Sequence, residues 1–368
     1  MGSCPDPVEY CRKAEAIGSD TLAQVIAAEV CAGRTPSVLV YDPHMPWAGR
    51  VARAAGLPTA AFMSRSCAVD LVYGEAWAGR APLPMADGSA LRRRGVVSVD
   101  LGPEDLSPFV VSPELYPKYL DVSIRQFEDL EEVDAVLINS FRDLEPHEAQ
   151  YMESRWLAKT VGPTLPSFFL DDGRLPSNRA YGGSVVLASY GTVYSMDAAE
   201  LEELAHGLCA SGNPFIWVVR PSEAQKLTEE VRDNCKQKGL IVPWCPQLEV
   251  LAHKAIGCFL THCGWNSTTE AITAGVPMVA MPRSADQPTN ARYVEKAWKI
   301  GVRMRANEKG YVTREEVDGC IKEVMGGERK EEYRANAKKF MKMAKEAMQE
   351  GGSSDKNIAD FAAMYLPN

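Results

Sequence analysis

One segment of the sequence, Gly257–Gly275, combines residue types that suit the binding of a diphosphate. It reads GCFLTHCGWNSTTEAITAG, in which an apolar strand-like run is followed by a glycine turn and a helical pattern that begins near Asn266. The first N–H groups of a helix lack intrahelical partners and lie at the positive end of its dipole, so they bind anions readily. Asn266 and Ser267 could cap this helix, and His262 could add a charge-assisted donor to the same phosphates.

Side chains suited to a nucleoside and a sugar lie within the same segment and on either side of it. Glu270 lies one turn into the helix, where its carboxylate could accept hydrogen bonds from both hydroxyls of a ribose. Trp244 precedes a Cys-Pro-Gln turn that would present its indole for stacking on a base. Asp286 and Gln287 follow a later strand, and a carboxylate beside a carboxamide suits hydrogen bonding to sugar hydroxyls. Each residue alone could be a cap, a turn residue or a core tryptophan, but the set favours a nucleotide-sugar site.

Alternating strands and helices must position these residues. Apolar runs separated by helical patterns indicate parallel strands with helical crossovers, and such sheets bind ligands at the carboxyl ends of their strands. The expected strands are Ser37–Tyr41, Pro58–Phe62, Ala135–Asn139, Val185–Tyr190, Pro214–Val219, Leu240–Val242, Gly257–Thr261 and Val276–Met281. The expected helices are Val8–Val30, Trp47–Ala55, Pro113–Leu130, Ala198–Ser211, Leu227–Lys238, Gln247–Leu251, Asn266–Ala274, Gln287–Lys299, Thr313–Met325, Arg329–Glu350 and Asp355–Met364, with a long loop over Ala81–Ser112.

The pattern predicts an α/β fold of two doubly wound Rossmann-like domains that face a cleft. Residues 1–165 form the expected first domain and residues 185–350 the second. A stretch rich in proline, glycine and aspartate predicts an interdomain linker over residues 166–184. Residues 351–368 are expected to form a C-terminal tail helix.

Composition excludes several classes of partner. The 368 residues carry a net charge of −9, which argues against nucleic acid or an anionic membrane surface. No apolar run approaches the roughly 18–20 residues of a membrane span, and the N-terminus does not resemble a signal peptide. The ten cysteines include no C-x-x-C pair, which favours reduced thiols in a cytoplasmic protein. A monomer is the expected state.

Taken whole, the segment from Trp244 to Gln287 resembles the signature of plant family-1 UDP-glycosyltransferases, the secondary-product glycosyltransferases. WCPQLEVLAHKAIGCFLTHCGWNSTTEAITAGVPMVAMPRSADQ has that signature's length of 44 residues without a gap. SYGT at Ser189–Thr192 resembles the loop on the diphosphate side of the family's donor site. YDPHMPW, SIRQFEDLEEVD and INSFRDLEP resemble grass enzymes that glucosylate trichothecenes or small phenolic acids.

The resemblance implies a fold of glycosyltransferase B type and inverting transfer from a UDP-sugar, with no metal and no cofactor besides that co-substrate. Trp244 would stack on uracil, and a final glutamine, Gln287, resembles the UDP-glucose users. The implied ribose ligands are Gln247 and Glu270; the diphosphate-side residues are Ser189, Thr192, His262, Asn266 and Ser267; and the sugar ligands are Trp265, Asp286 and Gln287.

The catalytic machinery implied by the resemblance is represented only in part. Family members use a histidine in a G-H-x-x-P context as general base and an aspartate that orients it. Asp42, in VLVYDPHMPW, matches the aspartate, and none of the five histidines matches the base. The chain is therefore expected to begin inside the first domain. His44 is a poor substitute, because residues two apart on a turn seldom point to one spot.

These observations predict an O-glucosyltransferase that moves glucose from UDP-glucose to a hydroxyl of a small phenolic or trichothecene-like molecule. The alternative is a sugar-nucleotide-binding remnant with little turnover, because loss of a general base costs about 10²–10⁴-fold. A nicotinamide-dependent oxidoreductase would need G-x-G-x-x-G between a strand and a helix, and a P-loop NTPase would need G-x-x-x-x-G-K-[ST]. The sequence contains neither.

Overall fold

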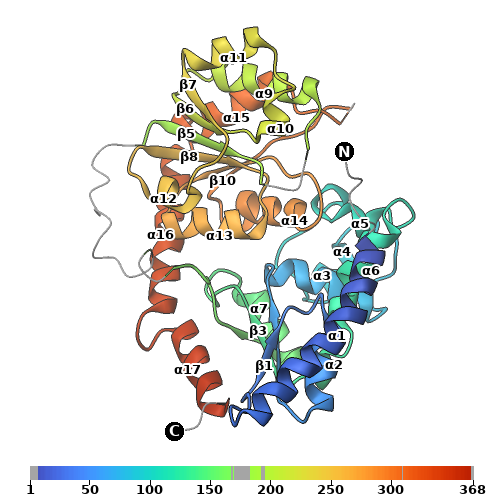
Figure 1. Cartoon of the computed structure of the whole chain (residues 1–368). Coiled ribbons are helices and arrows are strands. Elements are labelled where there is room, and N and C mark those ends of the chain that lie inside the picture. The colour runs from blue at the N-terminus through green and yellow to red at the C-terminus, as the bar shows by residue number, and fades with distance from the viewer. Residues whose placement is uncertain (1–6, 167–168, 170–182, 192–194, 309, 366–368) are drawn as a thin grey trace. The chain divides into compact units, whose positions relative to one another are not determined.

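The computed structural model describes residues 7–166, 169, 183–191, 195–308 and 310–365 (Figure 1). The chain divides into two compact units, each with its own parallel sheet. Unit 1 comprises Met1–Thr164 and Ala347–Asn368, and unit 2 comprises Leu165–Glu346. Two α/β units of this kind confirm the predicted fold class.

Unit 1 is built on a four-stranded parallel sheet in the order β1-β2-β3-β4. Its strands are β1 (Leu39–Tyr41), β2 (Thr59–Met63), β3 (Ala135–Ile138) and β4 (Lys159–Thr160). Its helices are α1 (Pro7–Cys31), α2 (Pro46–Ala54), α3 (Cys67–Trp77), α4 (Ser89–Arg93), α5 (Pro108–Val111), α6 (Pro117–Ile124), α7 (Pro146–Trp156) and α17 (Ser353–Tyr365), with short 3-10 turns at Pro103–Asp105, Arg125–Phe127 and Leu130–Glu132.

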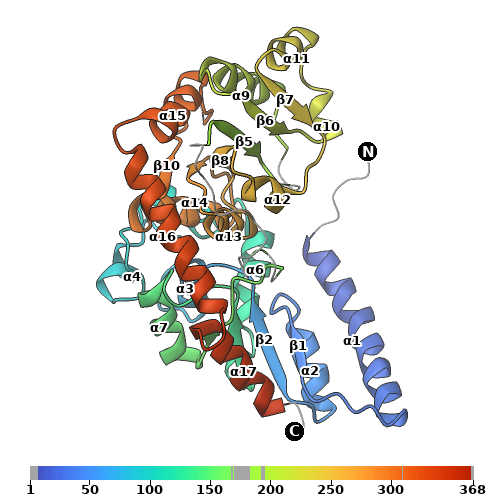
Figure 2. The ribbon, with the colours of Figure 1, turned by 90° about the vertical axis from the view of Figure 1, so that its left-hand side faces the viewer.

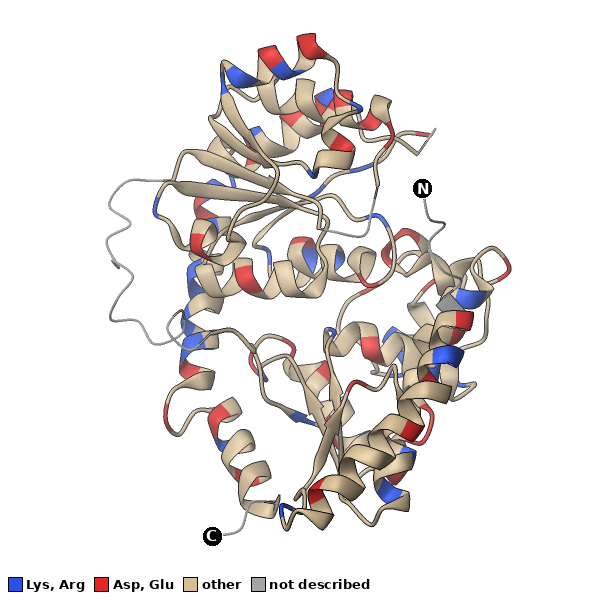
Figure 3. Ribbon diagram, in the orientation of Figure 1, with Lys and Arg blue, Asp and Glu red and all other residues tan. Residues whose placement is uncertain are grey.

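Unit 2 is built on a six-stranded parallel sheet in the order β10-β9-β8-β5-β6-β7. Its strands are β5 (Val185–Ser189), β6 (Phe215–Val218), β7 (Gly239–Val242), β8 (Ile256–Thr261), β9 (Met278–Ala280) and β10 (Gly301–Arg303). Its helices are α9 (Ala198–Ala210), α10 (Pro221–Ala224), α11 (Glu229–Lys236), α12 (Gln247–Ala252), α13 (Trp265–Ala274), α14 (Gln287–Arg292), α15 (Arg314–Gly326) and α16 (Lys330–Met348), and a π-helical turn spans Tyr293–Ala297. The central strands carry no charged residues, whereas the helices carry many (Figure 3).

Several elements that the sequence did not predict lack a clear periodicity. Every residue of α3 from Cys67 to Ala76 is buried, so this helix lacks the exposed polar face from which an amphipathic helix is predicted. Two strands, β4 and β10, contain only two and three residues. The segment predicted as one long loop, Ala81–Ser112, contains α4 and α5. In each case packing or brevity removes the pattern on which a sequence-based prediction depends.

The end of the chain returns to unit 1. The C-terminal tail helix predicted over residues 351–368 corresponds to α17, and the structure assigns the chain to unit 1 from Ala347 onward. In unit 1, α17 packs against β4. The Ser354 hydroxyl donates to the Gly162 carbonyl at 2.7 Å, and Asn357 Nδ2 donates to the Thr160 carbonyl at 2.8 Å. Residues 353–365 are therefore part of unit 1 and not a free tail.

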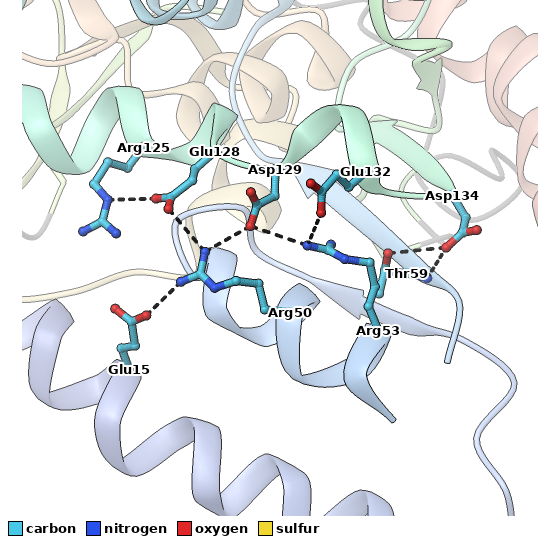
Figure 4. A network of polar contacts seen from close by, with 9 residues as sticks. All are labelled: Glu15, Arg50, Arg53, Thr59, Arg125, Glu128, Asp129, Glu132 and Asp134. Carbon is cyan, nitrogen blue, oxygen red and sulfur yellow. Dashed lines mark hydrogen bonds and ion pairs between the residues drawn. The ribbon is translucent and has the colours of Figure 1, made fainter. Parts of the chain in front are cut away.

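A network of ion pairs attaches α1 to the rest of unit 1 (Figure 4). Arg50 of α2 lies 2.8 Å from Glu15 of α1, 3.1 Å from Asp129 and 3.4 Å from Glu128. Arg53, one turn further along α2, also contacts Asp129 at 3.5 Å. These side chains are partly exposed, so each pair contributes about 1 kcal/mol or less. Figures 1 and 2 both show α1 beside α2, the packing that these ion pairs reinforce.

Candidate functional site

The candidate residues of unit 2 follow the carboxyl ends of its parallel strands. Ser189 ends β5, His262 follows β8, and the turn Arg283–Gln287 follows β9. Trp244 and Gln247 follow β7, and α12 packs against α13, which brings Gln247 next to the start of α13. The prediction of one shared edge is therefore confirmed for the described residues. Thr192 lies outside them.

Gln247 connects the two helices at this edge. Its Nε2 donates to Ser267 Oγ at 3.1 Å and to Glu270 Oε2 at 2.6 Å. Burial raises the pKa of Glu270, and the hydrogen bond from Gln247 opposes that rise only partly. Trp244 is 74% exposed, so its indole is presented to solvent as the sequence predicted. An exposed ring and a half-buried carboxylate suit a base and a ribose.

The start of α13 differs from the sequence-based expectation. The helix begins at Trp265 with Gly264 as N-cap, and no side chain caps it. Asn266 and Ser267 therefore lie inside the first turn and do not cap the helix. Asn266 is exposed, and Ser267 Oγ accepts from Gln247. The N-cap Gly264 has no side chain, and Asp286 accepts the Trp265 N–H, so it is the next N–H groups of α13 that remain suited to an anion.

Burial disfavours the charged form of His262, which the sequence predicted as a donor to the phosphates. Burial lowers the pKa of His262 to about 4. A Cβ added to Gly191, whose φ is +69°, would lie 2.8 Å from ring atom Cε1, and one added to Gly264 would lie 2.6 Å from Nε2. Both glycines therefore let backbone approach the ring closely. A neutral imidazole still offers one N–H donor, and Nδ1 is buried without a hydrogen-bond partner among the described residues.

The turn after β9 is held by side chains that the sequence placed beside a sugar. Asp286 Oδ2 accepts from the Trp265 backbone N–H at 3.1 Å and from Asn290 Nδ2 at 2.8 Å. Gln287 Oε1 accepts the backbone N–H groups of Arg283 and Ser284 at 2.9 and 3.2 Å. Only an oxygen can accept both bonds, so the orientation of the Gln287 amide is fixed.

Trp265, predicted as a sugar ligand, has a buried indole. Its side chain is only 3% exposed, and its ring lies 6.3 Å from that of Trp298 between centroids. The indole therefore belongs to the core, because burial of so large an apolar surface outweighs its exposure at a site. What Trp265 offers near the site is its backbone N–H, which is bonded to Asp286. Sequence reasoning also missed Asn290, although its spacing of four from Asp286 places both on one helix face.

In unit 1, Asp42 and His44 meet, contrary to the sequence-based expectation. Asp42 Oδ1 accepts from the His44 backbone N–H at 3.0 Å and lies 2.9 Å from His44 Nδ1. Arg65 Nη2 lies 2.6 Å from His44 Nε2. Burial raises the pKa of Asp42, but hydrogen bonds from His44 and the nearby charges outweigh burial and leave it below its usual value.

The Asp42–His44 pair opens onto a cavity within unit 1. The cavity has a volume of about 350 Å³. Apolar groups from α1, the β1–α2 loop and α6 make up much of its wall, with charged groups among them. Its lining includes Tyr10, Cys11, Ala14, Met45, Pro46, Trp47, Val122 and Arg125. A cavity of this kind accommodates a small, largely apolar molecule that carries a few polar groups.

Comparison with known proteins identifies the family. Residues 110–349 match the family described as UDP-glucoronosyl and UDP-glucosyl transferase. The chain is 60% identical to UDP-glycosyltransferase 79 of rice, over 99% of this chain and 83% of that protein. The chain belongs to the UDP-glycosyltransferase family. It is also 58% identical to UDP-glucosyltransferase UGT13248 of barley, over 99% of this chain and 81% of that protein.

Solved UDP-glycosyltransferases share the fold. A crystal structure of rice Os79 in complex with U2F and trichothecene matches with a TM-score of 0.94 and 60% identity, over 98% of this chain and 84% of that one. Phytolacca americana UGT2, complexed with UDP-2fluoro-glucose and pterostilbene, matches with a TM-score of 0.81 and 27% identity, over 96% and 81%. Both comparisons confirm the fold class that the sequence of this UDP-glycosyltransferase predicted.

The described residues contain no group of three or more His, Cys, Asp or Glu side chains placed to hold a metal ion. Among their helices, none is both long enough and apolar enough to cross a membrane.

The contact between Gly191 and His262 leads to a prediction. Gly191→Ala is expected to weaken UDP binding about tenfold, the equivalent of one good hydrogen bond, because its Cβ would displace the imidazole. Calorimetric titration with UDP measures this. Gly212→Ala is the matched control, since Gly212 also has a positive φ, +72°, but nothing within 4 Å of an added Cβ. Equal effects of the two variants on UDP affinity would contradict a role for the His262 contact.

Proposed function

We propose that this UDP-glycosyltransferase transfers glucose from UDP-glucose to a hydroxyl group of a small molecule, with inversion at the anomeric carbon. The observation that carries the proposal is the convergence of three subsites at one edge of the unit 2 sheet. Trp244 and the Gln247–Glu270 pair suit a uridine, the uncapped start of α13 with His262 suits a diphosphate, and Asp286 with Gln287 suits a hexose.

The chemistry assigned to these groups is mostly electrostatic. As the acceptor hydroxyl attacks the anomeric carbon, the bond to UDP breaks and negative charge develops on its β-phosphate. The first N–H groups of α13 and the N–H of the neutral His262 are placed to stabilise that charge. The acceptor hydroxyl must lose a proton in the same reaction. Asp42, which lines the cavity of unit 1, is the residue of this chain that we assign to that proton transfer.

The acceptor we propose is a trichothecene or a small phenolic compound. The rice enzyme Os79, 60% identical to this chain, has been solved with a trichothecene and with UDP and deoxynivalenol-3-glucoside. The cavity beside Asp42 is of a size for such molecules, and its lining combines apolar walls with charged groups. We further propose a cytoplasmic monomer that needs no metal or organic cofactor. The absence of C-x-x-C pairs and the net charge of −9 support that setting.

The test is product formation by the purified 368-residue chain. Incubation with UDP-glucose and a panel of trichothecenes and phenols should release UDP and give an acceptor glucoside detected by mass spectrometry. UDP-galactose in place of UDP-glucose should give much less product. UDP binding without any glucoside, across the panel, would contradict transfer by this chain.

That negative outcome would favour the second candidate, a UDP-sugar-binding protein with little turnover. One observation in the structure favours this second candidate. His44 holds Asp42 through Nδ1, but its Nε2 already accepts a hydrogen bond from Arg65 and so is not open to a substrate proton. Arg65 also stacks over Tyr73 at 5.0 Å, a contact that holds the guanidinium near His44.

A further inference from the structure

A buried ion pair lies beside the turn that carries Asp286 and Gln287. Arg283 Nη1 is 2.8 Å from Glu200 Oε1, and the two side chains are only 9% and 8% exposed. Ion pairs so deeply buried are costly to desolvate and are often no more stabilising than an apolar pair of similar size. A contribution to stability is therefore a poor explanation for the Arg283–Glu200 pair. The residues that the pair holds in place offer a better one.

Glu200 is fixed independently of Arg283. It lies in the first turn of α9, where its backbone N–H donates to Asp197 Oδ1 at 2.8 Å, the N-cap contact of that helix. A carboxylate in the first turn is also stabilised by the positive end of the helix dipole. Glu200 is therefore attached to a helix start that is fixed without Arg283, and its carboxylate can restrain the Arg283 side chain.

Arg283 belongs to the turn itself. Its backbone N–H and that of Ser284 both donate hydrogen bonds to Gln287 Oε1. Ala285, in the middle of the turn, has a φ of +55°, a left-handed conformation that costs a non-glycine residue energy and persists only under restraint. After Ala285 the turn is restrained by Asp286, which accepts hydrogen bonds from the Trp265 backbone N–H and from Asn290 Nδ2. Before Ala285 the turn is restrained by the ion pair between Arg283 and Glu200.

We propose that Glu200 is a positioning residue for the sugar half of the donor site, acting through Arg283 on the turn that orients Gln287. This inference rests on the proposed function, because it takes Asp286 and Gln287 as the ligands of the hexose. It assigns Glu200 no contact with the substrate. Its consequence is selective: loss of the ion pair should weaken binding of the glucose moiety and leave binding of UDP alone almost unchanged.

The test compares UDP with UDP-glucose by calorimetric titration of Glu200→Gln, a variant that keeps the volume of the side chain and removes its charge. The Kd for UDP-glucose is expected to rise about tenfold relative to wild type, the effect of losing one well-placed hydrogen bond. The Kd for UDP should stay within about twofold. Glu203→Gln is the matched control, because Glu203 lies on the same helix and pairs with Arg314, away from the turn. It should change neither Kd.

A second variant separates positioning from stability. Glu200→Leu combined with Arg283→Leu removes both charges and is expected to fold at least as stably as either single variant. It should still show the selective loss for UDP-glucose, because the turn is no longer tethered to α9. Recovery of wild-type UDP-glucose affinity in the double variant, or an equal loss for UDP in Glu200→Gln, would overturn the proposal. If wild type binds no UDP at all, the proposed function fails instead.

Discussion

Replacing Glu270 with alanine is expected to weaken UDP binding about 100-fold. Glu270 is a half-buried carboxylate whose Oε2 is 2.6 Å from Gln247 Nε2, and both ribose hydroxyls can donate to it. Hydrogen bonds to a charged group contribute about 1.5–3 kcal/mol each, so the loss of this acceptor costs about 3 kcal/mol, which corresponds to two powers of ten in Kd. Calorimetric titration with UDP measures the effect.

The control for this prediction is Glu249→Ala. Glu249 is an exposed glutamate on α12, close in sequence to Gln247, and it takes no part in the proposed site. Its replacement should leave the Kd for UDP unchanged within about twofold. Similar losses in the two variants would show that net charge, and not the ribose contact, controls the affinity.

The pH dependence of UDP binding tests the same group. Burial raises the pKa of Glu270, against the opposing hydrogen bond from Gln247. The ionised carboxylate is the form that accepts both hydroxyl protons, so affinity should fall as the pH drops through this raised pKa. That fall should begin at a higher pH than for an ordinary glutamate. In Glu270→Gln, this acidic limb of the affinity profile should be absent.

Replacing Asp42 with asparagine is the second large effect we expect, and it concerns turnover. The variant should lower kcat by about 10²–10³-fold, within the range that general acid–base groups contribute. The reason is that Asp42 is ionised, is bonded to the imidazole of His44 and lines the cavity of unit 1. The Kd for UDP should not change, since the residues that we propose as UDP ligands all lie in unit 2. Steady-state glucosylation with the best acceptor of the panel gives kcat.

Asp87→Asn is the matched control for Asp42. Asp87 Oδ1 accepts the Ser89 backbone N–H at 2.8 Å, the same local turn that Asp42 makes with His44, but it has no histidine partner. The control should keep wild-type kcat. If Asp42→Asn also keeps it, Asp42 is only a turn residue and the assignment of the proton transfer fails.

Much of the fold was predictable because its strands are short apolar runs between turn residues. The runs that became β5 and β8 were predicted to within one residue at either end. The fully buried α3 was missed, because a helix covered on all sides shows no amphipathic period. The helix predicted over Gln287–Lys299 begins as α14 and continues into a π-helical turn. Such a change of hydrogen-bond pattern leaves no signal in the periodicity of the sequence.

The placement of the candidate residues was predictable, but their electrostatics were not. The resemblance of the segment from Trp244 to Gln287 to the family signature named most of these residues, and the structure brings the described ones to one edge of a sheet. The neutral state of His262 and the burial of the Trp265 indole depend on neighbours distant in sequence. The pairing of Arg283 with Glu200 likewise joins residues far apart in the chain, and no local pattern marks it.

The most direct test of the account is a titration of the purified 368-residue chain with UDP and, separately, with NAD⁺. Both ligands carry a nucleoside on a diphosphate group and bind Rossmann-like sheets, so the comparison isolates what the residues of unit 2 recognise. We predict saturable binding of one UDP per chain, no measurable binding of NAD⁺ at the same concentrations, and UDP binding about 100-fold weaker in Glu270→Ala. Failure to bind UDP, or equal affinity for both nucleotides, would contradict the assignment of this edge as a UDP-sugar site.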